Sequence, residues 1–180
     1  MKRLILMVFL FSTSVLADDQ QRIEQSRHLA MELGQKLSSE LMVAMKAEGA
    51  VHAISVCNER APEIAAGLSQ NNNARVGRTA LRVRNPNNAP TGEHKAVMQY
   101  FQARLAKEPN TVPEVLFTAS NGEQHYMRAI PMQPQCAACH GSNIAPEVRN
   151  AIAQKYPNDQ ATGFEVGDLR GSFLIRWLAE

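Results

Sequence analysis

The order of secondary-structure signals along the chain predicts an α+β domain built around an antiparallel sheet. Apolar residues recur every three or four positions over the N-terminal third, which is typical of amphipathic helices. Two strand-like segments in the middle, 114–119 and 124–132, flank Asn121-Gly122, a pair that favours a tight hairpin turn. A further strand-like segment, 168–178, follows near the C-terminus.

The N-terminal third is expected to form helices separated by a glycine and a proline. Apolar residues follow a four-residue spacing over 20–48, and Gly49 then offers a stop. In the next helical run, Cys57 shares one face with Ile54. Pro62 lacks a backbone N–H and its ring would clash with a preceding carbonyl, so the helix must break or kink there. The predicted helices of this region are 20–48, 50–58 and 62–68.

The rest of the chain supplies the predicted sheet and two more helices. Residues 75–84 alternate between apolar and arginine side chains, which predicts a strand whose basic face carries Arg78, Arg82 and Arg84. An irregular connector follows, and Thr91 is placed to cap a helix. The remaining predicted elements are helices at 92–107 and 146–156, the two hairpin strands and the strand at 168–178.

Residues 1–17 have the pattern of a secretory signal peptide. Lys2 and Arg3 precede a mostly apolar run over 4–16, and Val15-Leu16-Ala17 resembles a cleavage site. The apolar run is shorter than the roughly 20 residues that span a bilayer. We therefore expect export to the periplasm, and a single mature domain, residues 18–180, that is not attached to a membrane after cleavage.

The charge balance excludes some classes of partner. The full chain has 19 basic and 17 acidic residues, and removing Lys2 and Arg3 leaves 17 of each. A neutral chain without long runs of one sign does not favour binding to nucleic acid or to an anionic membrane.

The segment Cys136-Ala137-Ala138-Cys139-His140 is a C-x-x-C-H signature, the pattern of covalent haem attachment. The two thiols add to the haem vinyl groups, and the adjacent imidazole binds the iron from one face. A zinc site is disfavoured because the chain has no second C-x-x-C pair. The sequence therefore predicts one covalent haem c, with Cys136 and Cys139 as thioethers and His140 as an axial ligand. Attachment would require the cytochrome c maturation machinery.

The haem motif uses two of the three cysteines and leaves Cys57 without a disulfide partner in its own chain. The odd count makes Cys57 the best candidate for the second axial ligand, although a buried, inert thiol is the simpler alternative. The other candidates are four histidines and six methionines outside the motif: His28, His52, His94, His125, Met31, Met42, Met45, Met98, Met127 and Met132.

Several stretches together resemble a known bacterial family. They are Ala53-Ile54-Ser55-Val56-Cys57, Ala61-Pro62-Glu63-Ile64-Ala65, residues 78–86 and 88–90, the haem segment 136–141, and the pieces 156–157, 161–164 and 167–171. The chain is similar to exported or membrane-linked monohaem c-type proteins with a PAS-like fold, first described structurally in cyanobacteria. The resemblance implies an α+β PAS-like sheet with long N-terminal helices, and iron held by His140 and Cys57.

The haem propionates need cationic partners, and arginine forks suit carboxylates. Arg78, Arg82 and Arg84 are the candidates, with Arg170 and Tyr126 behind them. The function that we expect is a periplasmic redox or diatomic-gas sensor that acts on an unknown periplasmic partner. The alternative is a low-potential electron-transfer cytochrome. An enzyme is least favoured, because no distal acid–base pair can be named from the sequence.

Overall fold

The computed structural model describes residues 12–178. Most of the predicted signal peptide, residues 1–11, lies outside the described residues, and residues 12–17 form the start of the first helix. Within the described part, no helix has both the length and the apolar character needed to cross a membrane.

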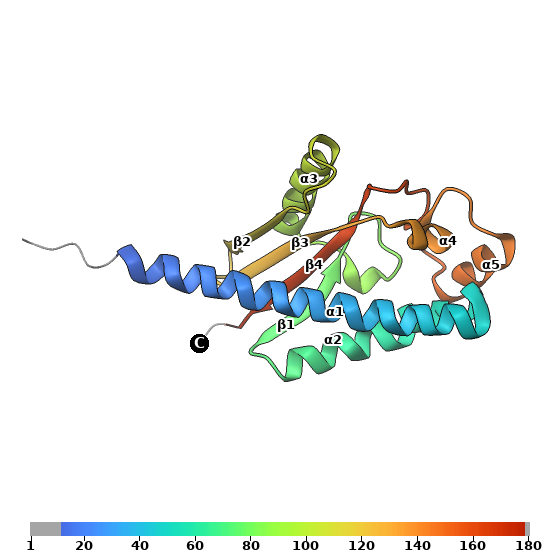
Figure 1. Cartoon of the computed structure of the whole chain (residues 1–180), viewed down its shortest axis with the longest axis horizontal. Helices are drawn as coiled ribbons and strands as arrows, with labels where there is room; N and C mark the ends of the chain where they lie inside the picture. The colour runs from blue at the N-terminus through green and yellow to red at the C-terminus, as the bar shows by residue number, and fades with distance from the viewer. Residues whose placement is uncertain (1–11, 179–180) are drawn as a thin grey trace, which may run out of the picture.

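The described chain is an α+β fold around one four-stranded antiparallel sheet, so the predicted class is confirmed. The strand order is β1-β4-β3-β2 (Figure 1), with a long helix along one face. This arrangement is compatible with the PAS-like fold that the resemblance implies. The strands are β1 (Ala74–Thr79), β2 (Glu114–Thr118), β3 (Gln124–Pro131) and β4 (Leu169–Trp177). The α-helices are α1 (Ser12–Ser55), α2 (Ala61–Gln70), α3 (Gly92–Lys107), α4 (Ala137–His140) and α5 (Pro146–Lys155).

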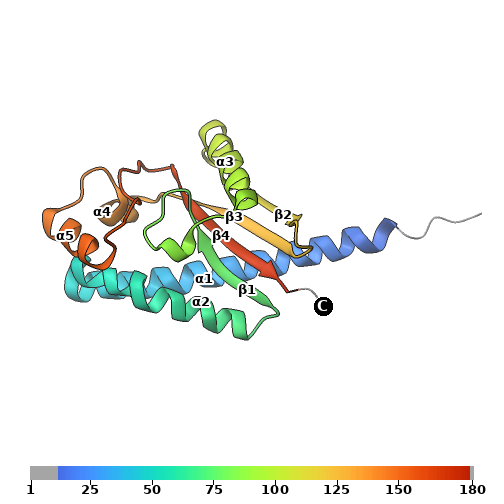
Figure 2. The same cartoon turned by 180° about the vertical axis from the view of Figure 1, so that it is seen from behind.

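Helices cover both faces of the sheet. Side chains alternate between the two faces along each strand, and apolar side chains lie on both, so each face packs against helices. Helices α1 and α2 pack on one face, and α3 packs on the other (Figures 1 and 2). The first core contains Leu33 of α1 against Tyr126 and Ile175. The second contains Phe101 of α3 against Met127, among others.

The N-terminal helix is interrupted where the sequence predicts it. Gly49 has φ of 81° and ψ of −178°, so α1 is two helical pieces that meet at this residue. Only glycine adopts this region easily. The first piece begins at Ser12, earlier than the expected residue 20.

The expected break before Pro62 takes the form of a π-helical turn, η1 (Val56–Arg60), between α1 and α2. The predicted helix 50–58 therefore ends earlier, at Ser55. The Ala61 N–H donates to the carbonyl of Val56, five residues back. The wider turn carries the chain past the missing N–H of Pro62, which lies in the first turn of α2 as predicted. Cys57 lies within this π turn.

The predicted strand 75–84 is too long. The three arginines that were expected on its basic face do not share one strand. β1 ends at Thr79, since the Ala80 N–H and the Thr79 hydroxyl both donate to the Asn88 carbonyl and turn the chain away from the sheet. Arg78 shares a strand face with Val76, which packs toward α1 and α2. Arg82 and Arg84 instead lie in the connector that follows β1.

The segment with the C-x-x-C-H motif lies at the end of the sheet where β3 ends (Figure 1). A short 3-10 turn, η3 (Pro134–Cys136), leads into α4. Backbone hydrogen bonds join this segment to the loop before β4. Gly163 donates to Gly141 at 2.9 Å, and Phe164 donates to His140 at 3.0 Å. The motif is therefore attached to a second piece of chain that follows it by about twenty residues.

Candidate functional site

The structure brings Cys57 into the neighbourhood of the C-x-x-C-H motif. Cys139 packs against an apolar cluster that includes Ile54, three residues before Cys57. Cys136 packs against a separate cluster of Met132, Ala161 and Phe164. All three cysteines are partly buried and none forms a disulfide. Burial raises the pKa of the Cys139 thiol against the opposing effect of Arg84, and the Cys57 and Cys136 thiols are near enough to raise it further.

The His140 ring has a defined tautomer. Its Nδ1 atom lies 2.7 Å from the carbonyl oxygen of Ala161. A carbonyl oxygen only accepts hydrogen bonds, so Nδ1 must carry the proton and donate it. Burial, helped by Arg170 and Arg84, lowers the pKa of His140 to about 2, so the ring is neutral. The Nε2 atom of a neutral ring protonated at Nδ1 carries a lone pair, which is the form that binds a metal.

Arg84 holds the loop that orients His140. It is buried, with 7% of its surface exposed. The guanidinium forms a two-pronged ion pair with Asp159, with both N···O distances 3.1 Å. It also donates to the carbonyl of Cys139 at 2.6 Å and to that of Ala161 at 3.2 Å. Arg84 therefore fixes both the motif and the carbonyl that accepts from His140.

Arg78 and Arg170 lie in the same region but lack such partners. Both are partly buried and close enough to His140 to lower its pKa. The Nε atom of Arg170 is buried without a hydrogen-bond partner in the described chain. Burial, and then the neighbouring Arg84 and Arg78, lowers the pKa of Arg170 to about 10. Burial also lowers the pKa of Arg78, which lies near Cys57.

Other residues singled out from the sequence have different roles or lie elsewhere. Arg82 is exposed, donates to the Gln160 carbonyl at 3.2 Å and stacks over the Phe164 ring at 4.1 Å. Tyr126 is buried under α1, where its hydroxyl donates to Glu114 at 2.7 Å. Two of the alternative ligands, His28 and His52, are exposed on α1.

Sequence reasoning missed Asp159 and Tyr156, as well as the carbonyl of Ala161. Asp159 is the buried partner of Arg84, and Tyr156 is a buried phenol near Cys57 whose pKa is raised to about 12 by burial and then by that thiol. No residue pattern reveals a backbone carbonyl as a hydrogen-bond acceptor. The polar Asn158-Asp159-Gln160 segment looks like an ordinary loop.

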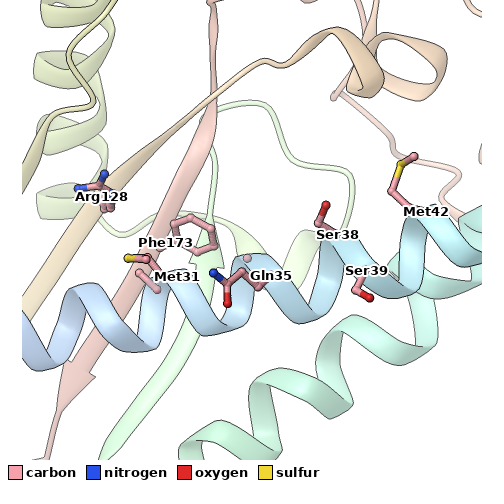
Figure 3. A pocket seen from close by; sticks show the side chains of 9 residues that line it. Met31, Gln35, Ser38, Ser39, Met42, Arg128 and Phe173 are labelled. Atoms are coloured by element: carbon pink, nitrogen blue, oxygen red, sulfur yellow. The ribbon is translucent and has the colours of Figure 1, made fainter.

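Two cavities adjoin α1, α5 and the loop after the motif. One, of about 400 Å³, lies between α5 and the loop after the motif, and Gly141, Tyr156 and Asp159 are among its lining residues. The other is a groove of about 510 Å³ between α1 and the sheet, lined by Met31, Arg128 and Phe173 among others (Figure 3). The first shares Asp159 with the arginine network around His140.

The fold and the site define an α+β domain in which two thiols, a metal-competent imidazole and a third thiol gather at one end of a sheet. A family model described as Tll0287-like matches residues 9–177, so the chain belongs to the Tll0287-like family. Among solved structures, the chain is similar to the cyanobacterial heme-protein Tll0287. The two are 29% identical with a TM-score of 0.60, over 92% of this chain and 95% of that one. No curated protein matches the chain.

Proposed function

We propose that this chain is a periplasmic c-type haem protein that acts as a redox or diatomic-gas sensor. Cys136 and Cys139 would hold one haem covalently, and His140 and Cys57 would bind its iron. The similarity to a structure described as a heme-protein supports the cofactor. The observation that carries the assignment is the His140 ring, whose Nδ1 donates to Ala161 and leaves the Nε2 lone pair available beside Cys139.

The residues around the motif fit a haem in two respects. The cysteine side chains pack against apolar clusters, which suit the porphyrin ring. The orphaned Nε of Arg170 is a cationic group that needs an anion, and a haem carries two carboxylates. When bound, the haem would supply an iron that exchanges one electron and that can bind a diatomic gas once a protein ligand has left.

The placement of Cys57 supports a sensor. A π turn is a rare form of helix that is frequent at functional sites. Gly49 lies on one side of the Cys57 turn and Pro62 on the other. Because Gly49 and the π turn interrupt regular α-helix, a movement of Cys57 can be absorbed locally while the rest of α1 stays packed on the sheet. A thiolate ligand would favour the ferric state of a bound haem iron, so reduction would weaken a bond between that iron and Cys57.

Gas binding to the reduced protein separates the sensor from the alternative, a low-potential electron-transfer cytochrome. The sensor requires that Cys57 leave on reduction, so the ferrous protein should bind carbon monoxide while the ferric protein resists added ligands. A Cys57→Ser variant should bind carbon monoxide at least as readily and serves as the control for an accessible iron. If the ferrous wild type fails to bind carbon monoxide while the variant binds it, electron transfer is the better function.

Export is the second testable part of this proposal. A chain without residues 2–16 should stay in the cytoplasm and carry no covalent haem on a peroxidase-stained denaturing gel. The full chain, expressed with the cytochrome c maturation machinery, should carry it. Covalent haem on the leaderless chain would contradict the periplasmic assignment.

A further inference from the structure

The buried charges around His140 are unbalanced in the described protein. Three guanidinium groups, those of Arg78, Arg84 and Arg170, lie close enough to one another and to His140 to shift its pKa or one another's. The carboxylate near them is that of Asp159, which is committed to Arg84 through two hydrogen bonds. The pair formed by Arg84 and Asp159 is neutral, so two positive charges remain.

One of the two remaining arginines also has a buried donor atom without a hydrogen-bond acceptor. The Nε of Arg170 is buried without a partner, and Arg78 is partly buried beside Cys57 and Tyr156. A buried guanidinium without an acceptor is costly, because it loses its hydration and gains nothing in exchange. The fold keeps both groups at the same place, where Arg170 also lies 5.5 Å from the Phe164 ring centroid.

We infer that Arg78 and Arg170 bind the two propionate carboxylates of the haem, and that Arg84 binds neither. This inference rests on the proposed function and concerns the same site. The two propionates carry two negative charges, which balance the two cations that Asp159 leaves uncompensated. Guanidinium forks match carboxylates in shape and charge. Arg84 positions the His140 loop, because Asp159 and two carbonyls already accept its hydrogen bonds.

The test compares Arg78→Gln and Arg170→Gln with Arg176→Gln in the haem-loaded protein. Arg176 is a matched control, since it lies on the same strand as Arg170 and also has a buried Nε without a partner. Arg176 lies opposite His125 in the β3–β4 register, on the part of the sheet away from the motif. The readout is the propionate bending region of the resonance Raman spectrum, together with the reduction potential.

We expect the propionate bands to shift in Arg78→Gln and in Arg170→Gln and to stay unchanged in Arg176→Gln. The reduction potential should fall in the first two, because loss of a nearby cation disfavours added negative charge at the haem. Arg170→Lys should restore part of the potential, since it keeps the charge but not the fork. Arg84→Gln should leave the propionate bands in place while lowering the stability of the protein.

Three outcomes overturn the inference. The first is wild-type propionate bands in both Arg78→Gln and Arg170→Gln. The second is a band shift in Arg84→Gln equal to theirs. The third is a wild-type potential that depends on phosphate concentration and loses that dependence in the variants, which would assign the arginines to a free anion. Failure of the haem assignment differs from all three, because the wild-type protein would then carry no haem to measure. Failure of the sensor function also differs, because it shows as a lack of carbon monoxide binding by the ferrous protein and leaves the propionate bands unaffected.

Discussion

Two histidine sites lie near opposite ends of β3, and they differ in how their ring nitrogens are used. Near the start of the strand, His94 of α3 and His125 of β3 are 3.0 Å apart, Nε2 to Nδ1. His94 Nδ1 lies 3.0 Å from the Thr91 hydroxyl, and His125 Nε2 lies 3.2 Å from a Glu123 carboxylate oxygen. All four ring nitrogens are therefore occupied. Beyond the C-terminal end of β3, His140 donates a hydrogen bond from Nδ1 to the Ala161 carbonyl, and its Nε2 is available as a metal ligand.

This difference shows which histidine can bind a metal, and burial alone does not. The Glu123 carboxylate accepts from His125, so His125 Nδ1 accepts from His94, and the Thr91 hydroxyl donates to His94. These hydrogen bonds connect α3 to the hairpin strand β3 and leave neither His94 nor His125 with a lone pair for iron. His94 and His125, which the sequence left open as axial ligands, thus belong to the scaffold of the sheet. His140 belongs to the site.

The largest expected effect comes from His140 itself. In the haem protein that we propose, His140→Ala should lose the six-coordinate low-spin spectrum completely, because His140 is the ring whose Nε2 is left available for the iron. His94→Gln and His125→Gln should each keep the wild-type spectrum, even where they lower stability. Absorption spectra of the purified ferric proteins decide this. Loss of low-spin haem in the His125 variant would break the comparison.

The next effect concerns the ion pair that holds the His140 loop. Arg84 and Asp159 have side chains that are 7% and 10% exposed. Removal of one partner from such a buried pair costs about 3–5 kcal/mol of unfolding free energy. Arg84→Met should therefore lower the urea midpoint strongly. Arg60→Met, at an exposed pair with Glu40, is the control and should leave the midpoint nearly unchanged. Equal effects would mean that the Arg84 network does not stabilise the loop.

The smallest effect is a pH dependence at the other histidine site. Burial, and then the neighbouring His125 and Arg176, lowers the pKa of His94, against the weaker opposing effect of Glu93. The unfolded chain, with a histidine pKa of about 6.5, then binds the proton more tightly than the folded one. Stability that is present above pH 6.5 is thus lost as the pH falls through the folded pKa of His94.

His94→Gln tests this sign. Urea midpoints measured from pH 7.5 down to pH 5 should fall more steeply for the wild type than for the variant. His52→Gln, at an exposed residue of α1, is the control and should follow the wild type. A wild-type midpoint that rises toward pH 5 relative to His94→Gln would contradict the assignment of a neutral His94.

Much of the scaffold could be predicted from local pattern, because helical spacing, the Asn121-Gly122 turn and Gly49 act over a few residues. The error at 75–84 arose because alternation alone does not show where a strand ends. The hydrogen bond from the Ala80 N–H to the Asn88 carbonyl lies within the connector, and the spacing of residues in the sequence does not reveal it. The C-x-x-C-H motif and the unpaired Cys57 could be singled out as candidates from the sequence, since the chemistry proposed for them depends on residue type.

The surroundings of the motif could not be predicted in the same way. Arg78, Arg82 and Arg84 look equivalent in the sequence, but one lies on the strand, one is exposed and one is locked to Asp159. What separates them is a partner 75 residues further along the chain. The acceptor for His140 is a main-chain carbonyl, for which any residue type would serve.

The central claim is that Cys57 and His140 bind the same iron, and one spectrum tests it directly. Electron paramagnetic resonance of the ferric wild-type protein should show a low-spin signal of the thiolate-ligated kind. Cys57→Ser should convert this signal to a high-spin form or to a different low-spin form, with covalent haem retained on a denaturing gel. An unchanged signal in Cys57→Ser would contradict the account.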